Sequence, residues 1–176
     1  INLITNTSER YELATLNLQV AQKAKSATAY KASLDYLKNG MQLLAPDKWK
    51  TQHALTLEIY IEATECAYLN GDLQLAEEYS ELVLGQDIPL LDTIKIYELR
   101  ISQKISQQKA EEALEISLQV LEALGMSQEQ ITHYSEEGGI VLPQLEDLEN
   151  GHHITSSSQL AIIRLLLSAT SAATIA

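Results

Sequence analysis

The chain has 176 residues, 45% of which are hydrophobic, and it carries a formal net charge of −12. This length suffices for one domain with a buried core, and so negative a charge argues against DNA or RNA as the main partner. No stretch approaches the roughly 20 apolar residues that span a bilayer, so we expect no membrane partner. With three prolines, seven glycines and many good helix formers, the composition predicts an all-α protein.

Hydrophobic residues recur with helical spacing through the first part of the chain. A first helix is predicted over residues 8–25, with Ser8 as its N-terminal cap. A second is predicted over 28–45, where a following proline disfavours further helix. A third is predicted over 50–69 and ends at the Asn-Gly turn of residues 70–71.

Three further helices follow with clear start and stop signals. Asp72 is placed to cap a fourth helix, which ends near Gly85. A fifth helix is predicted over 89–107, with its proline in the first turn. A sixth is predicted over about 109–124 and ends at Gly125.

The remaining sequence is less regular, and both ends of the chain lack the usual signals. The chain starts at Ile1 and stops inside an apolar helical pattern at Ala176, so we expect a single helical-repeat domain cut from a larger protein. Its parts are predicted as repeats over about 8–46, 48–86 and 88–125, an irregular insertion over 126–154 and the start of a next repeat over 156–176.

The three helix pairs align as repeats when their turns are superposed at Thr28, Gly71 and Gln108, with spacings of 43 and 37 residues. Small residues then share one position of the second helix: Ser33, Ala76 and Ala113. A second position on the same face holds Gly40, Val83 and Val120. Two helices approach to about 8–10 Å only where contact residues are small, and a lone hairpin cannot bury its apolar face. The pattern predicts a right-handed stack of antiparallel helix hairpins, a TPR-like α-α superhelix.

The small-residue pattern around the turns resembles tetratricopeptide repeats, whose period is about 34 residues. Four segments, at 9–37, 67–79, 90–101 and 110–125, resemble the helical-repeat region of large bacterial multi-sensor signal transduction multi-kinases. In that family a Ser/Thr-kinase-like domain and a P-loop ATPase domain precede such repeats, and a GAF-type sensor and a histidine kinase follow. The resemblance implies a connector between these modules, with neighbouring domains of the same polypeptide as its partners.

The sequence offers no candidate for catalysis, a cofactor or a metal. It has no G-x-x-x-x-G-K-[ST] phosphate loop, no H-R-D or D-F-G motif and no Gly-rich kinase loop. His152 and His153 are adjacent, so their side chains diverge and are not expected to ligate together. We therefore expect no enzymatic activity in this segment.

Cys66 is the single cysteine, which excludes a disulfide within one chain and fits a reducing, cytoplasmic location. Its neighbours include Glu62 and Glu65 but no base, which would raise the pKa of its thiol. A buried structural cysteine is therefore expected, and not a nucleophile.

Acidic residues are concentrated in the middle of the chain. Residues 51–94 hold nine Asp or Glu and no Lys or Arg, whereas residues 1–50 hold seven bases and four acids. This excess creates a local negative field. Two interpretations remain open: a solvated helix surface, and a surface that selects a basic partner.

The main functional candidate is the concave face of the repeat stack, lined by the first helix of each pair. The repeat register places ten residues there: Gln22, Lys25, Glu58, Ile61, Glu65, Tyr68, Lys95, Glu98, Ser102 and Ile105. Their mix of charged, aromatic and aliphatic side chains suits a peptide or another domain. Two other readings remain open: a ligand- or peptide-sensing groove, and packing against a neighbouring repeat. The apolar run at 160–176 is expected to pack on the preceding repeat or to form a homodimer.

Overall fold

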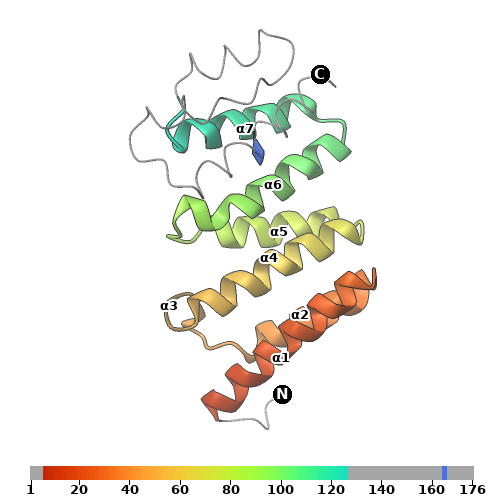
Figure 1. The fold of residues 1–176 in the computed structure, drawn as a ribbon, viewed down its shortest axis with the longest axis vertical. Coiled ribbons are helices and arrows are strands. Elements are labelled where there is room, and N and C mark those ends of the chain that lie inside the picture. Colours follow the sequence, from red (N-terminus) through yellow and green to blue (C-terminus); the bar gives the residue numbers. More distant parts are fainter. Residues whose placement is uncertain (1–5, 127–163, 166–176) are drawn as a thin grey trace. The chain divides into compact units, whose positions relative to one another are not determined.

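The computed structural model describes residues 6–126 and 164–165, and this part of the chain is all-α, as predicted. The long helices pack in antiparallel pairs, with one short helix between the first two pairs (Figure 1). Hairpin 1 comprises α1 (Thr7–Ser26) and α2 (Tyr30–Leu43), hairpin 2 comprises α4 (His53–Leu69) and α5 (Leu73–Leu84), hairpin 3 comprises α6 (Leu90–Ser106) and α7 (Ala110–Ala123), and the short helix is α3 (Lys48–Thr51). The chain divides into two compact units between Asp87 and Ile88, so that the first holds hairpins 1 and 2 and the second holds hairpin 3.

The three hairpins close through the same turn. The residue that the repeat alignment places at each turn has a left-handed backbone, with φ of 59° at Thr28, 80° at Gly71 and 60° at Gln108. In each turn the N–H of the following residue donates to the carbonyl five positions earlier, over 2.9 Å. This Schellman arrangement satisfies carbonyls that the helix end leaves without partners. The local structure therefore repeats where the sequence alignment predicts it.

Several predicted boundaries are confirmed. The Asp72 side chain accepts a hydrogen bond from the Leu75 N–H at 3.2 Å and caps α5. Gly85 is the residue at which α5 ends. Gly125 has a left-handed φ of 95° just after α7. Pro89 differs slightly from the prediction, because it lies at the cap position one residue before α6 and not in its first turn.

Two helix starts differ from the prediction. Asn6 caps α1 in place of Ser8, because its side-chain oxygen accepts the Ser8 N–H at 2.9 Å and Ser8 itself lies inside the helix. The predicted third helix is divided into α3 and α4 at Gln52, whose φ is −131°. The Gln52 side chain accepts the Ala45 N–H at 2.9 Å, so it holds the connection that leads out of hairpin 1.

The small residues of the repeat alignment lie at the helix crossings. Ser33, Ala76 and Ala113 are fully buried, each on the second helix of its hairpin. At the second aligned position, a methyl group added to Gly40 would lie 3.5 Å from the Asn17 Cβ and 3.5 Å from the Ile59 Cδ1. Side chains from α1 and α4 therefore both come close to this point of α2.

Within the first unit, α4 occupies the centre. It packs against α2 on one side and against α5 on another, and Ile59, Ala63 and Ala67 are fully buried. Hairpin 1 is also tied internally, because the Arg10 side chain donates to the carbonyls of Gln42, at 2.7 Å, and Leu43, at 3.1 Å. An arginine of α1 thus satisfies carbonyls at the end of α2.

The second unit has its own hydrophobic core between α6 and α7. The buried cluster consists of Ile94, Ile101, Ala113, Val120, Leu121, Met126 and Leu165. Leu165 is helical and fully buried in this cluster, so at this residue the predicted last helix packs on hairpin 3. The rest of that helix and the predicted insertion from residue 127 lie outside the described residues. In the described ranges, no helix is both long and apolar enough to cross a bilayer.

Thr28→Gly is expected to stabilise the protein. A β-branched residue is unfavourable in the left-handed region, whereas glycine adopts it without a Cβ clash. The free energy of unfolding should rise by about 1 kcal/mol in urea denaturation, and Gly71→Ala should lower it by a similar amount. Ala29→Gly, one residue on at an ordinary φ of −85°, is the control and should gain nothing. A loss of stability in Thr28→Gly would contradict the argument.

Ala76→Leu is expected to destabilise hairpin 2, because three added carbons cannot fit at a fully buried helix crossing. Overpacking of this kind should lower the free energy of unfolding by about 2–3 kcal/mol. Gln74→Leu on the exposed face of the same helix should change it by less than about 0.5 kcal/mol, and equal effects of the two would refute the crossing argument.

Candidate functional site

The ten predicted groove residues lie on the first helices of the three hairpins, as the repeat register required. Gln22 and Lys25 belong to α1, and the next four belong to α4. The last four, from Lys95 to Ile105, belong to α6 in the second unit. Glu58 is exposed and the other nine are half-buried. The structure describes the two groups separately, so the idea of a partner-binding groove across all ten stays a prediction.

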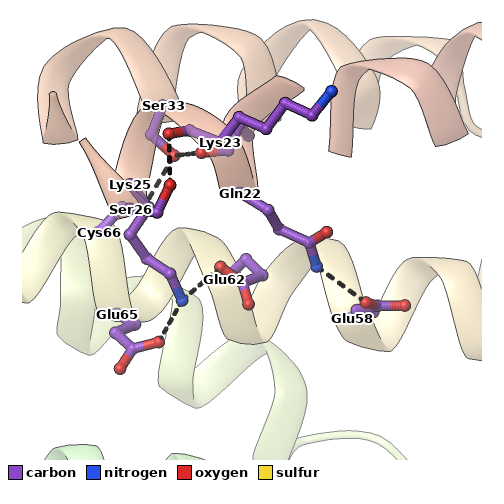
Figure 2. A network of polar contacts seen from close by, with 10 residues as sticks. Gln22, Lys23, Lys25, Ser26, Ser33, Glu58, Glu62, Glu65 and Cys66 are labelled. Carbon is purple, nitrogen blue, oxygen red and sulfur yellow. Dashed lines mark hydrogen bonds and ion pairs between the residues drawn. The ribbon is translucent and has the colours of Figure 1, made fainter. Parts of the chain in front are cut away.

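Four of the ten residues are brought together in the first unit, where they join α1 to α4 (Figure 2). The Gln22 side chain donates to the Glu58 carboxylate at 3.0 Å. One turn further on, the Lys25 Nζ lies 2.7 Å from carboxylate oxygens of both Glu62 and Glu65. We call these five residues the α1–α4 polar cluster. This part of the predicted surface therefore links neighbouring hairpins, which is the packing alternative considered above.

The charges of the polar cluster favour the ionised form of Lys25. Burial by itself lowers the pKa of Lys25, but hydrogen bonds and charge attraction from Glu62 and Glu65 outweigh it and raise the pKa above the ordinary 10.5. The side chains of Lys25, Glu62 and Glu65 are 23%, 16% and 22% exposed. Ion pairs in such partly shielded positions are stronger than those on an open surface.

Cys66 lies behind this cluster and is fully buried. Its Sγ is 3.1 Å from the Ser33 Oγ of α2, and the same hydroxyl donates to the Ala21 carbonyl of α1 at 2.8 Å. Burial raises the pKa of the Cys66 thiol more than Ser33 and Lys25 lower it. The expected burial of Cys66 is therefore confirmed, and burial contributes more to the raised pKa of its thiol than the neighbouring acids do.

The α6 residues have different surroundings in the second unit. Glu98 lies 3.5 Å from the Arg164 guanidinium. The Ser102 hydroxyl donates to the Glu98 backbone carbonyl at 2.9 Å, and Ile105 packs against the hydrophobic core of hairpin 3. These three side chains therefore make contacts within the second unit.

Glu62 is the member of the polar cluster that the groove prediction missed. It lies between Glu58 and Glu65 at the i+4 and i+7 spacing that defines one stripe of a helix. This stripe of three acids, next to a helix that carries Lys25, was the available signal. Pairing across helices still requires the distance between α1 and α4, which the sequence does not give.

No group of three or more His, Cys, Asp or Glu side chains in residues 6–126 and 164–165 is arranged to hold a metal. A shallow cavity of about 420 Å³ lies where the start of α1 meets the connection between α2 and α4, and Tyr11, Asp47 and Gln52 help to line it. None of the ten groove residues lines this cavity.

Sequence similarity links the chain to a segment of a signalling kinase. The chain is 23% identical, over 135 residues, to the hybrid signal transduction histidine kinase G of Dictyostelium discoideum. The match covers 72% of this chain but 4% of that protein. No family model and no solved structure match the chain. The predicted relation to a signalling kinase is thus confirmed as a weak similarity to one segment.

Lys25→Met is expected to destabilise the first unit, because it leaves two neighbouring carboxylates without their shared cation. The free energy of unfolding should fall by about 1–2 kcal/mol in urea denaturation at pH 7. Adding Glu62→Gln and Glu65→Gln should recover most of that loss. Lys23→Met removes the same charge from an exposed position of α1 and should cost less than about 0.5 kcal/mol. Equal effects of Lys25→Met and Lys23→Met would contradict the role of the cluster.

The stabilisation that Lys25 contributes is expected to depend on pH. The pKa of Lys25 is raised in the folded state, so its contribution is complete below the unfolded value and is lost as the pH rises through the folded value. The stability difference between the natural protein and Lys25→Met should therefore shrink above about pH 10.5.

Proposed function

We propose that the chain is a non-enzymatic helical-repeat scaffold of a signal transduction kinase, and that it couples neighbouring protein modules. In this proposal the hairpins continue one another as a right-handed, TPR-like superhelix. Its partners are protein domains of the same polypeptide, in the cytoplasm, and neither nucleic acid nor a membrane.

The similarity to a segment of a hybrid signal transduction histidine kinase carries the proposal. The matched stretch is a small part of that kinase, as expected for a segment that connects larger modules. Three hairpins with the same left-handed turn and the same buried small position support the repeat architecture.

The contacts within the first unit support a role in coupling protein modules and not a catalytic role. In an active site, titratable groups face a cleft in which a substrate can reach them. Here Lys25 pairs with Glu62 and Glu65, and Gln22 bonds Glu58, so these polar groups join one helix to another. Such contacts would transmit a displacement of hairpin 1 to α4.

This chain is expected to co-purify with the sensor or kinase modules of its own polypeptide when they are expressed separately. Lys95→Glu, on the predicted groove face of α6, should weaken capture by about tenfold, because it reverses a charge at the contact. Lys31→Glu makes the same change on an exposed position of α2 and should leave capture unaltered.

The outcome distinguishes the scaffold from the sensing alternative. Capture of a module that depends on Lys95 supports the scaffold. Binding of a small molecule or short peptide by the isolated chain, with no module captured, would favour the sensing alternative. Failure to bind any module would overturn the coupling role.

A further inference from the structure

Hairpin 1 exposes an aliphatic face on α1. Leu16 is 52% exposed and Val20 is 40% exposed. They are four residues apart, so they lie on one stripe of the helix. A single exposed leucine is common on protein surfaces and needs no explanation. Comparison with the same register positions in the other hairpins shows why this pair differs.

The equivalent residues of the next hairpin are fully buried. Ile59 lies twelve residues before its turn, as Leu16 does, and Ala63 lies eight before it, as Val20 does. Both Ile59 and Ala63 are completely inaccessible. Ile96, at the same register in hairpin 3, is also completely buried. An aliphatic residue thus recurs at the Leu16 position in all three hairpins, and it is exposed in hairpin 1 alone among them. At the Val20 position hairpin 3 carries Arg100.

The structure shows what covers this stripe in hairpin 2. It is α2, the second helix of the preceding hairpin, which packs along α4. A methyl group added at Gly40 of α2 would lie 3.5 Å from the Ile59 Cδ1, and Ser33 of α2 contacts Cys66 one turn beyond Ala63. A second helix with small residues at its crossing is therefore the occupant that this stripe is shaped to accept.

We propose that the Leu16–Val20 face is an interface for the second helix of one further repeat hairpin, supplied by the same polypeptide and stacked ahead of hairpin 1. Terminal repeats that face solvent carry a polar outer surface, whereas this face is aliphatic. In the similar kinase, the matched segment belongs to a much longer chain. The inference rests on the repeat architecture and not on the coupling role.

The position of Lys23 specifies the chemistry of the partner helix further. Lys23 is exposed and holds the register that Cys66 holds in hairpin 2. Its side chain points away from Glu62 and Glu65 (Figure 2). Since Cys66 meets Ser33 of α2, the incoming helix should carry a small hydrogen-bond acceptor, such as serine, at the position equivalent to Ser33.

The interface can be tested by fusing a second copy of hairpin 1 ahead of the original, because its α2 already packs on the first helix of a following hairpin. Residues 6–52 are duplicated and joined to Arg10, which is the register equivalent of His53, so that a second α2 is placed to cover α1. Leu16→Cys, introduced in the original hairpin 1, reports coverage through its rate of maleimide labelling, with buried Cys66 as a slow internal reference. We expect labelling to slow by at least about tenfold on fusion.

The matched control is Leu82→Cys on α5, a position that is 48% exposed; its rate should not change on fusion. An unchanged Leu16→Cys rate, in a fusion whose circular dichroism shows the added helices, would overturn the proposal. Slow labelling of Leu16→Cys in the unfused chain would mean that another segment of this chain covers the face. Protection that grows with protein concentration would mean that a second copy of the chain covers it. Each of these results would also refute the proposal. None involves a kinase module, so the coupling role is tested independently.

Discussion

The close approach of the two helices within each hairpin is the constraint on which the rest of this structure depends. A left-handed residue reverses the chain at once, and a small residue follows five positions later, as Ser33 follows Thr28. Because the turn and the small residue keep this spacing in every hairpin, the helices cross at the same distance from the turn. A larger residue at the crossing would push the second helix away from the first and from the next hairpin.

This crossing creates two layers of contact within the first unit. At its centre α2 lies against α4, and Gly40 leaves room for Ile59. Farther from that contact, α1 and α4 are bridged by the long side chains of Gln22 and Lys25. The apolar contact has one well-packed arrangement, whereas long polar side chains can change partners without repacking of the core. The first layer therefore fixes the register of the hairpins, and the second can respond to other charges.

The parts of the fold that could be predicted from sequence are those set by neighbouring residues. The turns at Gly71 and Gly125 and the cap at Asp72 were identified, since each acts within one helical turn. Thr28 and Gln108 carry no turn signature of their own and were located through their alignment with Gly71. The cap of α1 was misplaced because Asn6 and Ser8 are both good caps and the sequence does not rank them.

The missed elements depend on contacts between distant residues. Helical periodicity continues through Gln52, but its side chain bonds to Ala45 and the helix breaks there. In the candidate site, the register placed Lys25 and Glu65 on one face, and it could not show that they are 2.7 Å apart. Glu62 was left out for the same reason. A surface prediction from repeats thus finds the positions and leaves open whether they face a partner or one another.

In the polar cluster, contact with a partner and contact between α1 and α4 would involve the same side chains. Lys25 is shared by Glu62 and Glu65, and exposed Glu58 lies one turn away, so the cluster brings three carboxylates close together. Under the proposed coupling role, a basic group on a partner would be attracted to this site. To reach both carboxylates it would have to take the place of Lys25, because two cations cannot occupy the same short contacts. Binding there would release α1 from α4, so recognition of a basic partner and the contact between the first two hairpins would be thermodynamically linked.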